Sequence, residues 1–336
     1  MVKYCKQLKT FMVIPLVTGL FLVFLSQNKL YAQESVAFVQ GDGQILYADM
    51  DHWWSRTFKE SGLIGGKTIH YYEPGPAGDE YQKLDAPIPE LTPWSTSNVK
   101  ARVGVTAGNV SVYREPRGEG YCARLETNLK KVVVLGVVNV KAIASGSMYL
   151  GDMVDPITET GTPRHNTHMG IAFTGIPSAL RFDYKAVVGQ KRKMATGGFR
   201  VRDVKGPDMA EVIVLLQNRQ EDENGNFSVK RIGTGWLRIA ETTNQWIEGF
   251  EISIVYGDIT STGDYEPYMG LITHDDPFYA KNEKGKAVSY EESEWGNKTD
   301  GVTHLIVIFS ASYQGGNYMG SPESKLWVDN VELVYD

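Results

Sequence analysis

The sequence predicts an all-β fold, a two-sheet antiparallel β-sandwich with a jelly-roll-like arrangement. Apolar and polar residues alternate over several short stretches, as at Leu180, Phe182 and Tyr184, which is typical of half-buried strands. Three unbroken apolar runs predict strands covered on both faces: 132–140, 212–216 and 305–309. Beyond the N-terminal segment, no amphipathic helix longer than about two turns is found.

Turn and loop signals divide the strands. Residues 221–226 lie between two apolar runs and contain Asn-Gly, which favours a hairpin turn. Residues 257–297 are rich in Asp, Glu, Tyr, Gly and Pro, and a loop of that length is uncommon unless it is functional or disordered. Near the C-terminus, the alternation of apolar residues changes phase between Val328 and Val331, which predicts a β-bulge at Asp329-Asn330.

The N-terminus has the order of a secretory signal peptide. Lys3, Lys6 and Lys9 precede an apolar run at 11–25, and Leu30-Tyr31-Ala32 offers a small-residue cleavage site. The apolar run is shorter than the roughly 20 residues of a bilayer-spanning helix, although a retained anchor is the alternative. We therefore expect a signal peptide at 1–32, a lead-in at 33–48 and one domain at 49–336, without a membrane span after cleavage.

Charge and cysteine content narrow the classes further. Residues 1–32 carry four lysines and no acid, so their removal would lower the formal net charge from −6 to about −10. A negative balance excludes an ordinary nucleic-acid partner, which needs a basic face. Cys122 would be the single cysteine of the mature chain, and its strand-like surroundings predict a buried structural thiol.

Several segments together resemble one known family. Residues 169–185 (MGIAFTGIPSALRFDYK), Pro93-Trp94-Ser-Thr-Ser-Asn98, residues 121–127 (YCARLET), residues 144–151 (ASGSMYLG) and the ending at 309–335 follow its motifs in the right order. The family is the putative carbohydrate metabolism domain (PCMD) of Bacteroidetes envelope proteins. The resemblance implies a jelly roll similar to carbohydrate-binding modules, export to the periplasm or outer surface of a Gram-negative bacterium, and a role in glycan use.

Aromatic residues crowd the first third of the mature chain. Aromatic rings suit the apolar faces of sugars, and amides supply hydrogen bonds. The sequence therefore offers one set of candidate carbohydrate-binding residues: Trp53, Trp54, Tyr71, Tyr72, Trp94 and Asn98. The alternative is that these rings fill the core. Neighbouring rings in a strand face opposite sides, so we expect one member of each adjacent pair to be buried and the other to lie at the surface.

A calcium site is the second candidate. The stretch Asp49-Met-Asp-His-Trp53 resembles the opening of jelly-roll sugar-binding modules, and Asp329 matches an aspartate of their last strand. First and last strands are neighbours in such modules, so Asp51 and Asp329 could share a structural Ca²⁺ with backbone oxygens. The alternative is that both are solvated turn acids. Two further groups, His165 with His168 and 274–277 (HDDP), lack the third ligand or fixed partner that would identify a metal or catalytic site.

The sequence supports three functions in order. A non-catalytic glycan-binding module with a polysaccharide or oligosaccharide ligand comes first. A glycoside hydrolase or lyase with acidic residues on the concave sheet comes second, although no catalytic motif is found. A structural or adhesive protein with an envelope partner is third.

Overall fold

A computed structural model describes residues 38–76, 78–83, 92–134, 138–158 and 163–336. The expected signal peptide at 1–32 and residues 33–37 lie outside the described residues. All described residues belong to one compact unit that runs from Val36 to Asp336, so the lead-in from residue 38 packs with the rest of the chain. In the part of the chain that is described, no helix is long and apolar enough to cross a membrane.

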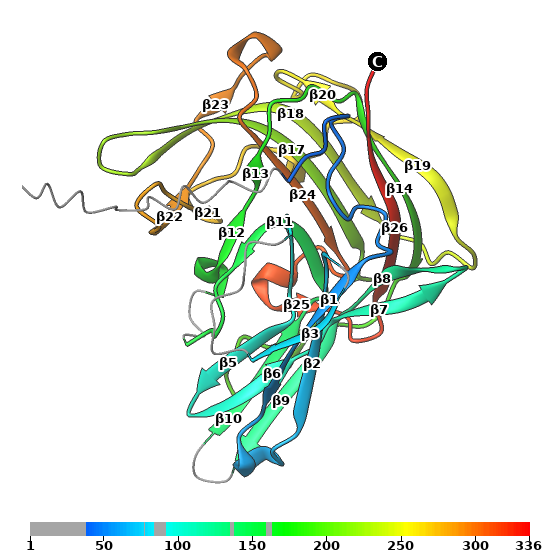
Figure 1. The fold of residues 1–336 in the computed structure, drawn as a ribbon, viewed down its shortest axis with the longest axis vertical. Helices are drawn as coiled ribbons and strands as arrows, with labels where there is room; N and C mark the ends of the chain where they lie inside the picture. Colours follow the sequence, from blue (N-terminus) through cyan, green and yellow to red (C-terminus); the bar gives the residue numbers. More distant parts are fainter. Residues whose placement is uncertain (1–37, 77, 84–91, 135–137, 159–162) are drawn as a thin grey trace, which may run out of the picture. The chain divides into compact units, whose positions relative to one another are not determined.

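Two large sheets form the fold, which confirms the all-β sandwich (Figure 1). The five-stranded sheet has the order β19-β14-β26-β8-β7. Its strands are β7 (Val112–Arg117), β8 (Gly120–Glu126), β14 (Ala179–Val187), β19 (Ile247–Ser253) and β26 (Lys325–Val334).

The eleven-stranded sheet follows the path β20-β18-β17-β24-β11-β12-β21-β22, and β4, β13 and β23 pair with it off that path. Its strands are β4 (Trp94–Thr96), β11 (Ser147–Met153), β12 (Thr167–Met169), β13 (Ile171–Ala172), β17 (Ala210–Glu221), β18 (Phe227–Ile239), β20 (Val255–Tyr256), β21 (Phe278–Lys281), β22 (Ala287–Tyr290), β23 (Glu294–Trp295) and β24 (His304–Ser310).

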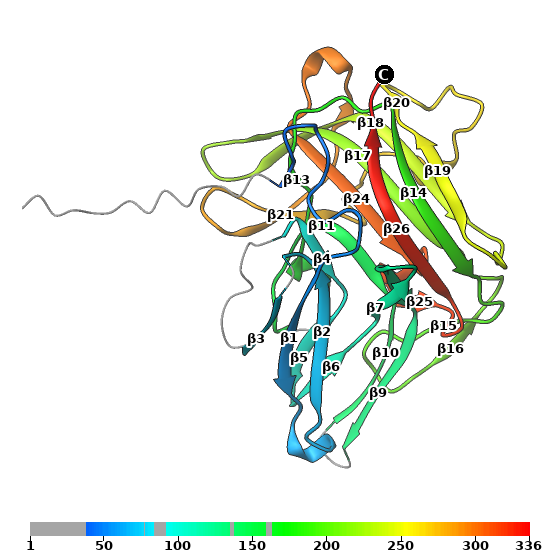
Figure 2. The same cartoon turned by 45° about the vertical axis from the view of Figure 1, so that its right-hand side comes forward.

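Four small sheets complete the architecture, and several of their hairpins gather below the large sheets in both views (Figures 1 and 2). Their strands are β1 (Trp53–Lys59), β2 (Thr68–Pro74), β3 (Gly78–Lys83), β5 (Val99–Val103), β6 (Val105–Asn109), β9 (Asn128–Val134), β10 (Val138–Ala144), β15 (Arg192–Met194), β16 (Arg202–Val204) and β25 (Met319–Gly320). The helices among the described residues are 3₁₀ turns: η1 (Gly62–Ile64), η2 (Pro163–Asn166), η3 (Pro267–Met269), η4 (Lys298–Asp300) and η5 (Gly315–Asn317).

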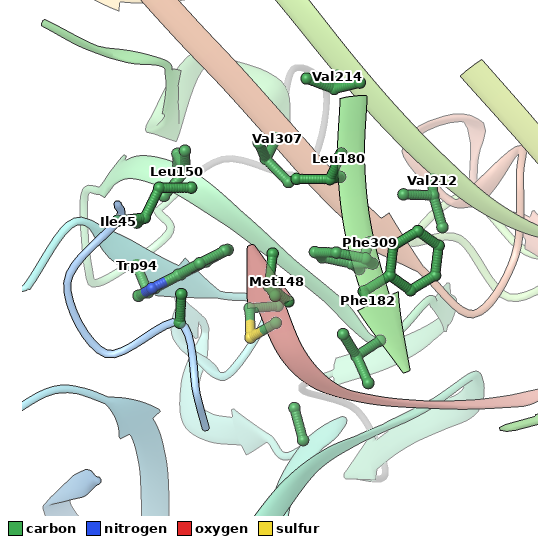
Figure 3. Packing of buried hydrophobic residues seen from close by; sticks show 14 of the residues in the cluster. Ile45, Trp94, Met148, Leu150, Leu180, Phe182, Val212, Val214, Val307 and Phe309 are labelled. Carbon is green, nitrogen blue, oxygen red and sulfur yellow. The ribbon is translucent and has the colours of Figure 1, made fainter. Parts of the chain in front are cut away.

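The main core lies between the two large sheets. Leu180 and Phe182 of β14 are fully buried, and the ring of Phe182 lies 5.3 Å from that of Phe309 on β24. Val212 and Val214 of β17 complete this layer, as Figure 3 shows. The predicted two-sided burial of 212–216 and 305–309 is confirmed, because the odd residues of β17 and the even residues of β24 face a second apolar cluster that includes Ile213, Leu215 and Ile306.

One strand prediction is wrong. Residues 132–140 do not form a doubly covered strand. β9 and β10 pair only with each other in a two-stranded sheet, and Val133 is 58% exposed. A two-stranded sheet has no further layer to cover both faces, so the apolar run is split between a covered side and an open side.

Local predictions at two turns are confirmed. β17 and β18 form a hairpin closed at 222–226, with Gly225 at φ 87°. The bulge in β26 is present, because Arg181 pairs with Glu332 while Asp183 pairs with Asp329, and Asn330 has φ 48°. The expected irregular stretch at 257–297 contains η3, β21, β22 and β23, and its Ile272, Ala280 and Tyr290 cover the outer face of the large sheet.

Candidate functional site

Most of the residues expected to bind carbohydrate lie in the interior. Trp53, Trp54, Tyr71, Trp94 and Asn98 are each at most 5% exposed. Trp94 lies among Ile45, Met148 and Leu150 (Figure 3), and its Nε1 donates to the Leu46 carbonyl at 2.9 Å. These side chains therefore take the alternative role, filling the core, and offer no face to a ligand.

The expectation for adjacent rings is correct for one pair only. Tyr71 is buried and Tyr72 is half-buried, with the Arg114 guanidinium 5.3 Å from the Tyr72 ring. Trp53 and Trp54 are both buried, because protein covers each face of β1. One indole nitrogen, Nε1 of Trp53, donates to the Met50 carbonyl at 2.6 Å.

Asn98 fastens the backbone near β7. Its Oδ1 accepts from the N–H groups of Ser111 and Val112, both at 2.9 Å, and its Nδ2 donates to the Val112 carbonyl at 2.8 Å. An amide whose bonding capacity is used this way has little left for a sugar hydroxyl. We leave Asn98 and the five buried or half-buried rings out of the candidate site.

The two carboxylates expected to hold calcium meet other partners. Asp51 Oδ1 accepts from the Tyr121 N–H at 2.9 Å. Asp329 Oδ2 accepts from Arg117 at 2.7 Å, and the same guanidinium donates to Asp183 at 2.8 Å. Burial raises the pKa of Asp329, opposed by Arg117, and the charge of Asp51 adds to the rise. The two acids are thus near enough to interact, but a guanidinium already neutralises one of them.

The donor set does not fit a calcium ion. Among the described residues, no group of three or more His, Cys, Asp or Glu side chains is arranged to hold a metal. Ca²⁺ takes six to eight oxygens, and Asp329 would have to give up its ion pair with Arg117 to contribute. Cys122 is free and buried, as expected, and burial raises the pKa of its thiol to about 12.

A different group of side chains gathers on the outer face of the eleven-stranded sheet. We call it the ring–arginine surface, and it consists of Arg192, Glu211, Trp236, Arg238, Tyr268 and Tyr313. Its three rings are half-buried and so keep part of their surface open to solvent.

Sheet register sets this surface. Glu211 of β17 pairs with Arg238 of β18, and the next residue on the same face, Ile213, pairs with Trp236. On its other side Glu211 pairs with Ser310 of β24. Tyr268, in η3, comes from the stretch that covers this face of the sheet. Side chains from separate segments are therefore held on one rigid sheet.

Arg238 is the centre of the surface. Its guanidinium carbon lies 3.8 Å from the Tyr268 ring centroid and 4.5 Å from that of Tyr313. Trp236 meets Tyr268 edge to face at 5.9 Å, and Arg192 lies 4.6 Å from the Tyr313 ring. Cation–π contacts of this kind fix both the rings and the guanidinium.

Glu211 is the acid of the surface. Its Oε1 accepts from Arg238 Nε at 2.8 Å and from Trp236 Nε1 at 3.0 Å. Burial raises the pKa of Glu211, and the bonds from Arg238 and Trp236 oppose that rise. The surface thus combines open ring faces with charged donors and one oriented carboxylate, a combination that can stack on a sugar ring and hydrogen-bond its hydroxyls.

Charged side chains also lie around the surface. Arg192 Nη2 donates to the Gln314 side chain, and Arg164 pairs with Asp276. The charge of Arg164 also acts on Glu211. The predicted acidic turn at 274–277 therefore supplies an ion pair to this region.

Sequence reasoning missed the ring–arginine surface because its members are scattered. One signal was available: Trp236 and Arg238 alternate on one face of a strand that follows a recognisable hairpin turn. Extending that hairpin from Glu221 and Phe227 would pair Glu211 with the wrong residue, because the register shifts between Leu216 and Gln217. The contribution of Tyr268 has no local signal at all.

Comparisons with known proteins agree on the class of protein. The model of the family described as "Putative carbohydrate metabolism domain" matches residues 73–334. Among curated proteins, none matches the chain.

Solved structures show weaker similarity. A putative glycoside hydrolase from Bacteroides thetaiotaomicron is 18% identical with a TM-score of 0.46, and the match covers 83% of this chain and 71% of that one. A putative glycoside hydrolase from Bacteroides vulgatus is 18% identical with a TM-score of 0.47, covering 84% and 99%. The xylanase 10B modules of Clostridium thermocellum with xylohexaose are 10% identical with a TM-score of 0.21, covering 72% and 26%.

The family match extends from β2 to the end of β26 and so includes both large sheets and the ring–arginine surface. The protein belongs to the putative carbohydrate metabolism domain family.

Proposed function

We propose that this protein is an exported, non-catalytic glycan-binding module of carbohydrate utilisation that works in the periplasm or at the outer surface of a Gram-negative bacterium. Its ligand is a polysaccharide or oligosaccharide. The export part of the proposal rests on residues 1–32, and the glycan part rests on family membership and the ring–arginine surface.

One observation carries the proposal. Trp236, Tyr268 and Tyr313 are half-buried rings held in place by Arg238, and Glu211 is fixed beside them. Rings held by a cation lose little conformational freedom when a ligand stacks on them, which favours binding. In binding, the rings would stack on sugar faces while Arg192 and Arg238 donate to hydroxyls.

A glycan array with the mature protein tests the proposal. We expect wild type to retain a subset of glycans and Tyr268→Ala to lose it. Trp246→Ala is the matched control, because Trp246 carries a similar contact to Arg117, at 3.9 Å, next to the other sheet. Loss of binding in Trp246→Ala alone would move the site to the five-stranded sheet. An array without any bound glycan would contradict the proposal and favour an envelope protein as partner.

Hydrolysis is the second candidate, and the raised pKa of Glu211 favours it. A carboxyl group kept protonated by burial is the property of the general acid in glycoside hydrolysis. Incubating an array-selected glycan with wild type and with Glu211→Gln separates the two functions. Products formed by wild type and not by Glu211→Gln would establish hydrolysis, whereas an intact glycan with both proteins supports binding.

A further inference from the structure

A small polar cavity lies away from the ring–arginine surface, where β11, β12, β17, β21 and β24 come together. Its volume is about 110 Å³, several times the roughly 30 Å³ that one water occupies in the liquid. The polar residues that line it are Asp152, His168, Arg219, Lys281 and His304.

His168 directs an unused nitrogen into this region. The residue is 4% exposed, and its Nδ1 lies 2.7 Å from Asp152 Oδ1. Its buried Nε2 has no hydrogen-bond partner within the described ranges. Asp152 is itself neutralised on its other oxygen by Lys281 at 2.8 Å. A buried polar atom without a partner is costly, so Nε2 is suited to a ligand.

Arg219 supplies a cation that no carboxylate balances. Its Nε donates to Gln217 Oε1 and its Nη2 donates to Tyr290 Oη, both at 2.7 Å. Both acceptors are neutral groups, since burial raises the pKa of Tyr290 to about 12. The described residues include no ion pair of Arg219 with an acid. The nearby Glu292 binds Arg231 through both oxygens, which leaves Arg219 as a buried, uncompensated charge.

The charges around the cavity therefore sum to an excess of positive charge. Lys281 offsets Asp152, and Arg219 remains. His304 adds no charge near neutral pH, because burial and the Arg219 charge lower its pKa to about 3. Gly170 keeps the guanidinium accessible: a Cβ there would lie 2.6 Å from Arg219 Nη2, and its φ of 95° also favours glycine.

We propose that this cavity is an oxyanion-binding site, in which Arg219 and His168 Nε2 bind a carboxylate or sulfate group. The group belongs either to an acidic sugar or to a free inorganic anion. An oxyanion at Nε2 needs a proton on that nitrogen, and the Asp152 carboxylate on the opposite nitrogen stabilises the doubly protonated ring. Charge-assisted bonds from a guanidinium and an imidazolium are the strong bonds of such sites.

Side-chain NMR of the six histidines tests this site in the mature wild-type protein. Sodium sulfate, glucuronate and glucose are titrated in turn, with sodium chloride holding the ionic strength constant. We expect sulfate or glucuronate to move the His168 and His304 signals saturably, while the exposed His52 and His274 stay in place and glucose has no effect. Tighter binding of glucuronate than of sulfate identifies an acidic sugar as the source, and the reverse identifies a free anion.

Two variants extend the test to affinity. His168→Gln and Arg219→Gln should each weaken binding of the preferred anion about tenfold or more, whereas Arg181→Gln, an exposed arginine on the other sheet, should not. If neither anion moves the His168 signals, or if glucose moves them equally, the proposal is wrong. The site is independent of the proposed glycan binding, because neutral glycans would still bind the ring–arginine surface when this cavity takes no anion.

Discussion

The guanidinium of Arg117 joins Asp183 to Asp329 across three strands of the five-stranded sheet. The distances are 2.8 Å to Asp183 and 2.7 Å to Asp329. Asn330, in the bulge of β26, adds a bond from its Nδ2 to Asp183 at 2.9 Å. The end of the last strand is thus held by an arginine in the place where the sequence suggested a metal ion.

This ion pair predicts that calcium has no effect on stability. Asp329→Asn should lower the free energy of unfolding by about 1–3 kcal/mol, because Arg117 loses a charged acceptor. The loss should be the same in calcium and in chelator. Melting curves of both proteins under both conditions check this, and a calcium-dependent rise in wild type that Asp329→Asn abolishes would restore the metal site.

The bulge predicts a backbone preference at Asn330. Its φ of 48° lies in the left-handed region, which costs an ordinary residue about 1–2 kcal/mol and costs glycine almost nothing. Asn330→Ala and Asn330→Gly lose the same bond to Asp183, so their difference isolates the backbone. We expect the glycine variant to be the more stable of the two by denaturant unfolding. Equal stabilities would mean that the backbone at 330 changes in the alanine variant.

His304 predicts a loss of stability in mild acid. Burial and the charge of Arg219 lower its pKa to about 3, whereas an unfolded histidine titrates near about 6.5. The unfolded state therefore binds the proton first, and stability falls as the pH drops from about 6.5 towards about 3. The contribution between pH 7 and pH 5 is about 2 kcal/mol, from roughly 1.4 kcal/mol per pH unit.

His304→Gln removes this contribution. Urea unfolding at pH 7 and pH 5 should show that wild type loses more stability than the variant over that interval. The two proteins share every other titrating group, so their difference reports His304. Parallel losses in both proteins would show that His304 is protonated in the folded state at pH 5.

The cavity around His168 predicts a cost for filling it. Gly170→Ala would place a Cβ against Arg219 Nη2 in a backbone conformation that alanine rarely adopts. We expect a loss of about 1–2 kcal/mol in stability. Gly198→Ala is the control, because nothing lies within 4 Å of its Cβ position and its φ is unrestricted. A Gly170→Ala protein as stable as Gly198→Ala would show that the guanidinium moves aside at little cost.

The sequence predicted the fold well where a local pattern determines it. Alternation located β14, an Asn-Gly turn located the β17–β18 hairpin, and a phase change located the bulge at Asp329-Asn330. The same rules could not locate the functional surface. A bulge after Leu216 shifts the pairing that brings Glu211 opposite Arg238, and the position of Tyr268 depends on the path of 257–297 over the sheet.

Burial was the other feature that the sequence could not supply. Trp53, Trp54 and Trp94 have the composition of a sugar platform, yet the small β1–β2–β3 sheet and the lead-in cover them. An aromatic residue in a strand is compatible with both roles, and only the layer above it decides. The rings that remain half-open, such as Tyr268, belong to a segment without regular alternation.

The central claim is that the ring–arginine surface binds glycan, and calorimetric titration of an array-selected glycan tests it most directly. Removing one stacked ring typically costs about 1–3 kcal/mol, by analogy with stacking on nucleic-acid bases. Tyr268→Ala should therefore weaken binding by roughly fivefold to more than a hundredfold with an unchanged unfolding midpoint, and Trp246→Ala should bind like wild type. Wild-type affinity in Tyr268→Ala, with its fold intact, would contradict the claim.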